Sequence, residues 1–501
     1  MGLVEFMNLK REVVQFEVLC LLVSGICAAV AADDSPAIRL PSVIGDNMVL
    51  QRDQVVPIWG WSVSGAKVIV QFAGQTRTAT ADSGGRWEVR LRSMRANAVP
   101  SSMTITATES CVLTNILVGE VWLCSGQSNM EKPIGDQRGQ RPTVNAAGEL
   151  ATGDQFPQIR LFKVLNVRSS TRLQDVRPEA TWTACSSNAL EVTKFSAVGY
   201  FFGREICRKV NVPVGLIESS WGGTMIEPWT PAEAYQSVPR LADLARVAPG
   251  DTNLAAVARP AVIYNAMIAP LAPFGIRGVL WYQGEQNCKD AESARLYRDK
   301  MEAMIWSWRK LWDEGSFPFY YVQLAPYTYY TGQTDPRVAS VETLPQMWEA
   351  QTAALRSPRT GMAVIYDTVD NLGDVHPVRK REVGERLARI ALAQDYRQKA
   401  VCSGPTFGSV RFAKGIAVVR FDHVDGGLVT NDGKPPTWFE IAGADGKYVT
   451  ADAVTDGDKV IVSSPGVPAP KAVRLGWSEL AQPNLFNGAG LPVRPFRTDS
   501  W

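Results

Sequence analysis

Hydrophobic and polar residues alternate in short runs through the first part of the chain. Residues 67–72 (KVIVQF) and 87–91 (WEVRL) place every second side chain on one face, and stretches rich in serine, aspartate and glycine separate such runs. A period of two residues is typical of half-buried β-strands. We therefore predict an N-terminal β domain over residues 33–117, with a β-sandwich-like architecture.

The pattern changes between residues 118 and 400, where short apolar runs alternate with segments of helical periodicity. Such alternation predicts an α/β domain with a mostly parallel sheet, helices on both of its faces, and an active site at the carboxyl ends of the strands. After Val401 the β pattern returns and predicts a C-terminal β domain over residues 401–501. The strands expected in the α/β domain cover residues 121–124, 159–164, 214–218, 278–282, 319–324 and 362–366.

The first 32 residues have a different composition. Lys10 and Arg11 precede an apolar run over residues 18–32 that ends in small residues. This run is shorter than the roughly 20 residues of a membrane-spanning helix. We predict a signal peptide over residues 1–31, cleaved after Ala31, and hence a secreted or periplasmic protein without a membrane segment. An uncleaved anchor is the alternative, since Glu12 and Glu17 lie beside the run.

Charge and cysteine content exclude several classes of partner. With 52 basic and 50 acidic residues the net charge is +2, which favours neither nucleic acid nor an anionic membrane surface. The six cysteines beyond the predicted signal peptide are dispersed without CxxC spacing, so a cysteine-based metal site is not expected. Most of these cysteines lie in apolar stretches, where buried free thiols are expected rather than disulfides.

A serine and a histidine carry the clearest chemical signal. Ser128 lies in Gly126-Gln127-Ser128-Asn129-Met130, directly after the expected strand 121–124. This is where α/β hydrolases place a nucleophile, and a serine hydroxyl needs a base, usually histidine. Of the two histidines, His376 follows the expected strand 362–366 at the same sheet edge, whereas His423 falls in the C-terminal β domain. We predict Ser128 as the nucleophile and His376 as the base.

Asp374 is the candidate third member of the site. It lies two residues before His376 and could stabilise the imidazolium that forms when Ser128 loses its proton. Its alternative role is to cap the helix that follows. Asp370 and Asp367 are reserve candidates.

Two further loops are expected at the same edge and could stabilise an oxyanion. Gly222 and Gly223 follow the strand 214–218, and residues 283–287 (QGEQN) follow the strand 278–282. Glycine lets backbone N–H groups approach a developing negative charge closely. Either loop alone carries little information, but four loops around one serine and one histidine favour a hydrolase site.

The sequence lacks the motifs that nucleotide-dependent or zinc-dependent enzymes would need. There is no GxGxxG after the first strand and no P-loop, and two distant histidines supply too few ligands for zinc. We therefore expect neither a cofactor nor a metal. Glu285 is a candidate glycosidase carboxylate, but nothing supplies a second carboxylate at a defined spacing.

With these motifs, the chain resembles the sialate O-acetylesterases and related carbohydrate acetylesterases of the SGNH hydrolase superfamily. The resemblance implies a flavodoxin-like core with Ser128 as nucleophile and His376 as base. The oxyanion would be held by the backbone of Ser128, by the Gly222-Gly223 turn and by a side chain of the third block. The similarity rests on residues 46–52 (DNMVLQR), 119–131 (GEVWLCSGQSNME), 221–224 (WGGT), 281–285 (WYQGE), 376–377 (HP), 490–492 (GLP) and 495–498 (PFRT).

Two departures from the superfamily pattern leave roles open. The usual third block is Gly-x-Asn-Asp, whereas this chain has Gly284-Glu285-Gln286-Asn287, so either Gln283 or Asn287 is the candidate side-chain donor. The usual aspartate lies three residues before the histidine, whereas Asp374 lies two before it. A backbone carbonyl is therefore the alternative partner of the imidazole.

The family resemblance implies an O-acetylated carbohydrate as substrate, with sialic acid favoured. Acetylxylan or another plant polysaccharide is the alternative, because the absence of Asn-x-Ser/Thr sequons suggests a bacterial glycan forager. A sialate enzyme should carry an arginine near its pocket for the carboxylate, and an enzyme for neutral glycans should rely on aromatic platforms. A non-catalytic glycan-binding protein is the alternative from another class. The oligomeric state is left open.

Overall fold

The computed structural model describes residues 38–499 except 138, 247–252, 257 and 331–339. The chain divides into two units, residues 1–36 and residues 37–501, and every described residue belongs to the second. The predicted signal peptide, residues 1–31, lies outside the described residues. Within the described part, no helix is both long and apolar enough to cross a membrane.

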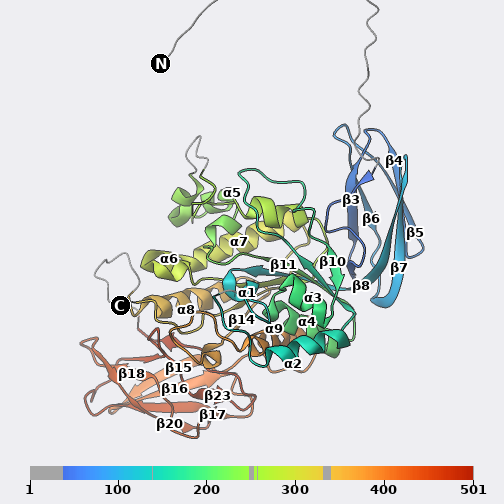
Figure 1. Ribbon diagram of the computed structural model, residues 1–501. Helices are drawn as coiled ribbons and strands as arrows, with labels where there is room; N and C mark the ends of the chain where they lie inside the picture. The colour runs from blue at the N-terminus through green and yellow to red at the C-terminus, as the bar shows by residue number, and fades with distance from the viewer. Residues whose placement is uncertain (1–37, 138, 247–252, 257, 331–339, 500–501) are drawn as a thin grey trace, which may run out of the picture. The chain divides into compact units, whose positions relative to one another are not determined.

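A mostly parallel sheet forms the centre of the α/β part (Figure 1). Its strands lie in the order β10-β9-β11-β8-β12-β13-β14, and all neighbours are parallel except β10 and β9. The chain builds strands on one side of β8 before it builds those on the other, so the loop after β8 lies at a topological switch point, where α/β sheets bind ligands. The strands are β8 (Ser110–Gly126), β9 (Ile159–Lys163), β10 (Trp182–Ala184), β11 (Val214–Ser220), β12 (Gly278–Tyr282), β13 (Phe319–Val322) and β14 (Thr360–Ala363).

Helices cover both faces of this sheet, as predicted. On one face α4 (Ala197–Val210) packs against α9 (Lys380–Gln394), and Gly199 of α4 allows close contact with Cys124 of β8. Cys124 pairs with Leu280, so the next residue, Trp281, points to the opposite face. There the Trp281 ring meets Trp308 of α7 (Tyr297–Trp312) edge-on, with centroids 5.9 Å apart. The shorter helices are α1 (Ser128–Glu131), α2 (Ala146–Ala151), α3 (Ser187–Thr193), α5 (Ala232–Gln236), α6 (Ala291–Arg295) and α8 (Thr343–Ala353).

The N-terminal strands join the central sheet through β8. The first half of β8 pairs with β7, and its second half pairs with β11 and β12. The predicted domain boundary between residues 117 and 118 therefore falls inside one continuous strand of 17 residues. The other strands of this part are β1 (Ile38–Arg39), β3 (Val56–Ser62) and β6 (Arg86–Leu91) in one sheet, and β2 (Val49–Gln51), β4 (Lys67–Phe72), β5 (Gln75–Thr80) and β7 (Asn97–Thr106) in the sheet of β8.

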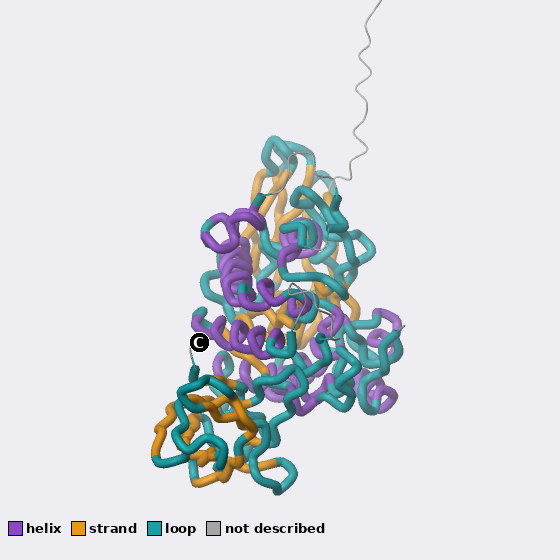
Figure 2. Tube along the Cα trace, turned by 90° about the vertical axis from the view of Figure 1, so that its left-hand side faces the viewer, coloured by secondary structure: helices purple, strands orange, loops and turns teal. Residues whose placement is uncertain are grey.

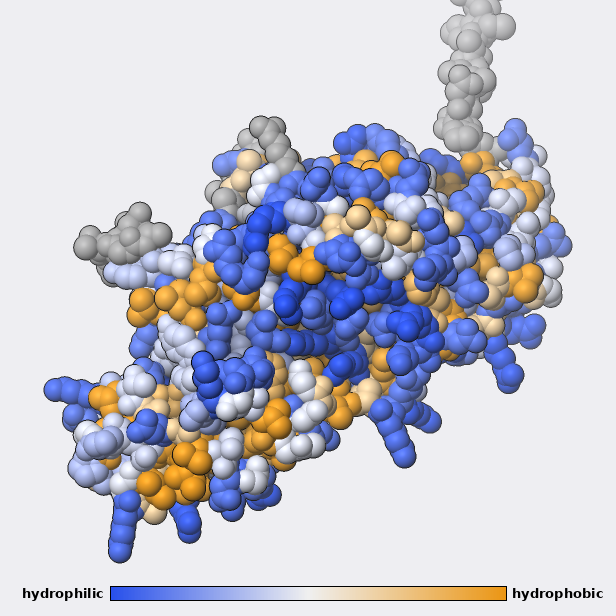
Figure 3. Space-filling view, turned by 60° about the horizontal axis from the view of Figure 1, so that its bottom comes forward, coloured by the Kyte–Doolittle hydropathy of each residue, from blue (hydrophilic) through white to orange (hydrophobic). Residues whose placement is uncertain are grey.

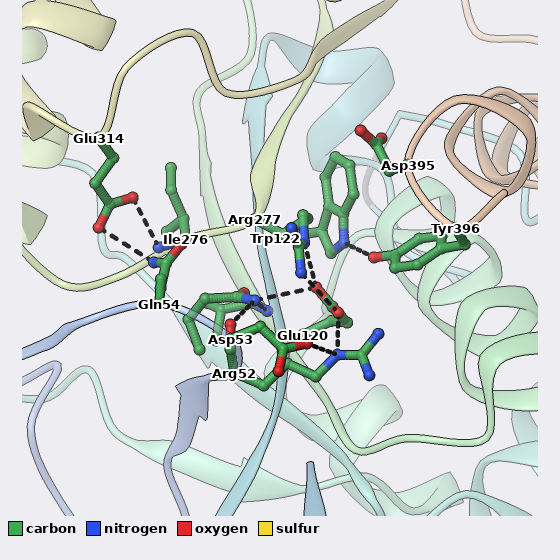
Figure 4. Close-up of polar contacts among 12 residues, drawn as sticks. Arg52, Asp53, Gln54, Glu120, Trp122, Ile276, Arg277, Glu314, Asp395 and Tyr396 are labelled. Atoms are coloured by element: carbon green, nitrogen blue, oxygen red, sulfur yellow. Dashed lines mark hydrogen bonds and ion pairs between the residues drawn. The ribbon is translucent and has the colours of Figure 1, made fainter. Parts of the chain in front are cut away.

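A buried carboxylate connects the N-terminal motif at residues 46–52 to the central sheet (Figure 4). Glu120 of β8 is fully buried and forms ion pairs with Arg52 and Arg277, the latter at 2.7 Å. Gln51 donates to the same carboxylate at 3.1 Å and accepts the backbone N–H of Val121 at 2.7 Å. The motif therefore fixes the N-terminal strands to β8, six residues before that strand reaches the loop with Ser128.

The described residues after α9 form strands and loops without a helix (Figure 2). This agrees with the β pattern of the sequence after Val401. The Glu479 carboxylate connects this part to the α/β part by accepting the backbone N–H groups of Tyr329 and Tyr330, at 3.0 and 3.1 Å. The strands are β15 (Thr406–Ala413), β16 (Ile416–Asp422), β17 (Leu428–Thr430), β18 (Phe439–Ala442), β19 (Tyr448–Thr450), β20 (Asp452–Asp456), β21 (Lys459–Ser463), β22 (Ala472–Leu475), β23 (Leu485–Asn487) and β24 (Phe496–Arg497).

On the face shown in Figure 3, hydrophobic residues lie in separate patches among hydrophilic ones, so this face offers no single large apolar surface.

The cysteines of the described residues are free thiols, as the sequence predicted. They are Cys111, Cys124, Cys185, Cys207, Cys288 and Cys402.

Candidate active site

Ser128 begins the short helix α1 directly after the switch-point strand β8. The turn between them is tight, because Gln127 donates its backbone N–H to the carbonyl of Tyr282 at 3.0 Å. Gly126 has φ of +138°, and a Cβ atom at this position would lie 2.1 Å from the Tyr282 carbonyl oxygen. Only glycine fits there. The glycine of the motif therefore allows β8 to end close to β12 and to present the serine at the sheet edge.

His376 reaches Ser128 from the loop between β14 and α9. Its Nε2 atom lies 2.9 Å from Ser128 Oγ, the distance of a hydrogen bond between a nucleophile and its base. Burial lowers the pKa of His376 to about 4, and the positive charge of Lys380 acts in the same direction. The imidazole is therefore neutral near pH 7 and can accept the serine proton.

Asp374 lies beside this histidine but does not make a short hydrogen bond to its ring. Its Oδ1 atom accepts the backbone N–H of His376 at 2.9 Å and lies 3.6 Å from Nδ1. Its Oδ2 atom accepts Nε of Arg141 at 2.9 Å. Burial alone would raise the pKa of Asp374, but these two hydrogen bonds outweigh it and hold the pKa below its usual value. The carboxylate is therefore ionised and placed to interact with an imidazolium.

The two reserve aspartates have other partners. Asp370 binds the guanidinium of Arg141 through both carboxylate oxygens, at 2.8 and 3.0 Å. Asp367 forms a bidentate ion pair with Arg386, with both contacts at 2.6 Å. The second histidine, His423, lies in the C-terminal β part, where its carbonyl accepts Nδ2 of Asn487. Among these groups, Asp374 is the carboxylate next to the Ser128–His376 pair.

The turn at Gly222 and Gly223 packs directly on Ser128. A Cβ atom at Gly222 would lie 3.3 Å from the Cβ of Ser128 and 3.0 Å from Oε2 of Glu131. The backbone N–H of Gly222 donates to that same Glu131 oxygen at 2.7 Å. Gly223 has φ of +73°, and its N–H has no acceptor within the described residues. One of the two glycine N–H groups is therefore engaged, and the other is available to a ligand.

Gln283 and Asn287 lie in the interior of the loop network. Both are fully buried. Nε2 of Gln283 contacts Oε1 of Gln127, the carbonyl of Thr224 and Oδ1 of Asn287, at 2.9 to 3.1 Å. Nδ2 of Asn287 donates to the Glu227 carboxylate and to Oγ of Ser293. Their side-chain donors are therefore occupied by protein acceptors, and these amides brace the loops after β8, β11 and β12 against one another.

The structure adds a buried contact network that the sequence did not single out. Nδ2 of Asn129 donates to Oε1 of Glu285 at 2.5 Å and to the Val375 carbonyl at 2.9 Å, and its Oδ1 accepts Nζ of Lys380 at 2.5 Å. Asn129 thereby joins the serine loop to the residue that precedes His376. Burial lowers the pKa of Lys380 to about 7 and raises that of Glu285. The only sequence signal for these roles was that Asn129 and Glu285 lie inside the recognised blocks.

The described residues contain no cluster of three histidine, cysteine, aspartate or glutamate side chains able to hold a metal ion. The same edge holds the Ser128 hydroxyl within hydrogen-bond distance of the neutral His376 imidazole, with a glycine turn beside them. These groups are the ones that acyl transfer through a serine ester requires.

Known carbohydrate esterases are similar to this chain in sequence and in fold. Residues 118–392 match the family model described as carbohydrate esterase, sialic acid-specific acetylesterase. Human sialate O-acetylesterase is 32% identical over 403 residues, which cover 74% of this chain and 73% of that protein. The mouse enzyme is 30% identical over 429 residues, which cover 75% and 76%. A carbohydrate acetylesterase from Xanthomonas citri has a TM-score of 0.81 and 37% identity, and the match covers 93% of this chain and 100% of that one. This chain is an esterase and belongs to the family of sialic acid-specific carbohydrate acetylesterases.

Proposed function

We propose that this esterase removes O-acetyl groups from sialic acid through an acetyl-enzyme formed on Ser128. The observation that carries the proposal is the 2.9 Å contact between Ser128 Oγ and His376 Nε2 at the switch point of the sheet. The choice of sugar is supported by the description of the family and by the mammalian relatives that bear the name sialate O-acetylesterase.

The reaction needs only residues of this chain and water. Ser128 Oγ attacks the acetyl carbonyl carbon while its proton passes to Nε2 of His376. The tetrahedral intermediate then collapses, the bond from the carbonyl carbon to the sugar oxygen breaks, and the imidazolium returns its proton to that oxygen. Water, deprotonated by the same Nε2 atom, then attacks the acetyl ester of Ser128. The bond from the carbonyl carbon to Ser128 Oγ breaks, the imidazolium returns its proton to Oγ, and acetate leaves.

The proposed oxyanion donors are the backbone N–H groups of Ser128 and Gly223. Neither N–H has an acceptor within the described residues, whereas the N–H of Gly222 is bound to Glu131. Glu131 would then hold the glycine turn against the serine, which leaves the next N–H free for the substrate. We assign Gln283 and Asn287 a supporting role, because their side-chain donors already have protein acceptors.

Acetate release from an O-acetylated sialic acid tests the proposal. Ser128→Ala should lower kcat by at least about 10⁴-fold, since the nucleophile and base of such sites act as a unit. The native protein should react covalently with a fluorophosphonate, and Ser128→Ala should not. A Ser128→Ala protein with native activity would overturn the mechanism. Native protein that neither reacts with the probe nor releases acetate would favour a glycan-binding protein.

A second candidate substrate is an acetylated neutral polysaccharide such as acetylxylan. The reason to test it is that the Xanthomonas citri structure, 37% identical to this chain against 32% for the human relative, is described as a carbohydrate acetylesterase without mention of sialic acid. Acetate release from O-acetylated sialic acid, acetylxylan and a small aryl acetate, compared as kcat/KM, separates the two substrates.

We also propose that the chain is exported and loses residues 1–31. The basic and apolar composition of that segment supports this proposal. N-terminal sequencing of protein recovered from the periplasm or the medium should begin at Ala32. Recovery of the active protein with Met1 intact would contradict it.

A further inference from the structure

An arginine stacks on a tryptophan beside the catalytic turn. The guanidinium carbon of Arg168 lies 4.4 Å from the ring centroid of Trp221. Both residues are partly buried. The Nε atom of Arg168 is buried without a hydrogen-bond partner in the structure, and no carboxylate of the described residues lies within ion-pair distance of its guanidinium. The charge of Arg168 is therefore uncompensated within the described chain.

Hydrogen bonds connect this pair to the loop that carries Ser128. Trp221 immediately precedes Gly222, and its own N–H donates to the carbonyl of Gly126 at 3.0 Å. The segment of Arg168 is attached to the same turn, because Asn166 donates to one oxygen of the Glu131 carboxylate while Gly222 donates to the other, at 3.3 and 2.7 Å. The stacked pair thus borders the turn that lies against Ser128.

Two other arginines near these loops are already neutralised. Arg141 binds Asp370 and Asp374, and Arg172, on the same segment as Arg168, pairs with Glu233 at 2.8 Å. Arg172 also lies over an aromatic ring, that of Tyr264 at 5.4 Å. Arg168 and Arg172 therefore each lie over an aromatic ring, but only the guanidinium of Arg172 is paired with a protein carboxylate.

From these observations we infer that Arg168, held over the ring of Trp221, binds the carboxylate of an O-acetylated acidic sugar whose acetyl group lies at Ser128. This inference rests on the proposed function and assigns its substrate class. A planar guanidinium pairs with a carboxylate through two parallel hydrogen bonds, and stacking on the indole fixes its orientation before the substrate arrives. Trp221 leaves an apolar surface beside the charge, as sugar-binding sites do.

The simpler alternative is that Arg168 only covers the tryptophan. In that case its replacement would affect acidic and neutral substrates equally. A carboxylate anchor, in contrast, would act only on substrates that bear the charge. A comparison of acidic and neutral substrates therefore separates the two roles, and O-acetylated sialic acid and acetylated galacturonan serve as the acidic ones.

The test compares kcat/KM on O-acetylated sialic acid, its methyl ester, acetylated galacturonan, acetylxylan and a small aryl acetate. For Arg168→Gln, the ratio of kcat/KM on the preferred acidic sugar to that on the aryl acetate should fall about 10- to 100-fold, mostly through KM. Arg168→Lys, which keeps the charge but not the bidentate geometry, should show an intermediate ratio. Arg172→Gln is the matched control, and its ratio should equal that of the native enzyme.

The methyl ester tests the inference without a mutation. Native enzyme should show a KM at least about tenfold higher on the methyl ester than on the free acid, and this preference should vanish in Arg168→Gln. An unchanged ratio in Arg168→Gln, or equal KM values for acid and ester in native enzyme, would overturn the inference. If the native protein does not hydrolyse the aryl acetate, that result would instead count against the proposed esterase mechanism. The larger kcat/KM of the two acidic substrates identifies the source of the carboxylate.

Discussion

Replacement of Asp374 by asparagine measures how much the histidine depends on its neighbouring carboxylate. The nearest carboxylate oxygen lies 3.6 Å from Nδ1 of His376, beyond the range of a good hydrogen bond. The same oxygen accepts the His376 backbone N–H, and the other oxygen is bound to Arg141. Asp374 can therefore act through its charge, while the tautomer of the imidazole does not depend on a short bond to it.

The size of the effect follows from Coulomb's law. Two unit charges 3.6 Å apart interact by about 5 kcal/mol at an effective dielectric constant of about 20, and by about 1 kcal/mol in water. The side chains of His376 and Asp374 are 17% and 20% exposed, and Arg141 neutralises part of the carboxylate charge. We therefore expect Asp374→Asn to raise the activation free energy by about 1–2 kcal/mol, a loss of about 5- to 30-fold in kcat.

Steady-state rates on an aryl acetate check this estimate, with pH as a second variable. Asp374 raises the pKa of His376, so the asparagine variant should keep the imidazole neutral to lower pH than the native enzyme. Arg141→Gln is the opposite control, because it frees the Asp374 charge and should raise the pKa of His376. A loss of about 10⁴-fold in Asp374→Asn, as expected when an aspartate orients the ring directly, would refute the reasoning. A native rate would show that the charge is not used.

Three further changes probe other contacts of the site and fold. Lys380→Met removes a positive charge that lowers the pKa of His376. The acid limb of the kcat/KM profile should therefore move from about pH 4 toward neutral pH, by about one pH unit. An acid limb that stays in place would contradict this account. Gly222→Ala places a Cβ atom 3.3 Å from that of Ser128 and should lower kcat about 10- to 100-fold with a native circular dichroism spectrum. Glu120→Gln leaves two arginines without their buried partner and should lower the free energy of unfolding in urea by about 3 kcal/mol, while activity at low urea stays native.

The position of the sheet edge that holds the candidate site could be predicted because strand ends have a simple sequence signature. The run predicted over residues 278–282 is strand β12 residue for residue, and the loops after β8, β11 and β12 do meet. The choice of His376 followed from the scarcity of histidine, and the structure places its ring at hydrogen-bond distance from Ser128. These features depend on local periodicity and on the rule that parallel strands end at one edge.

The remaining contacts could not be predicted because they depend on distances between segments far apart in the chain. Lys380 binds Asn129 across 251 positions, and no local pattern distinguishes it from a surface lysine of a helix first turn. Gln283 and Asn287 were plausible oxyanion donors by residue type, but their burial engages their donors with protein acceptors. Residue type shows what a side chain can donate, and only packing shows whether that donor is free.

The charges of Lys380 and Asp374 act on His376 in opposite directions. Lys380 favours the neutral imidazole, and Asp374 favours the imidazolium. Burial and Lys380 hold His376 neutral in the resting enzyme, but in the proposed mechanism the same effects oppose the imidazolium that forms when Ser128 attacks. A base with a pKa of about 4 would be a weak proton acceptor if its surroundings stayed fixed. In the proposed mechanism the oxyanion develops beside the ring as the proton arrives, and Asp374 stands 3.6 Å from the other nitrogen. Both negative charges favour the imidazolium at that moment, so the site suits the transition state better than the resting state.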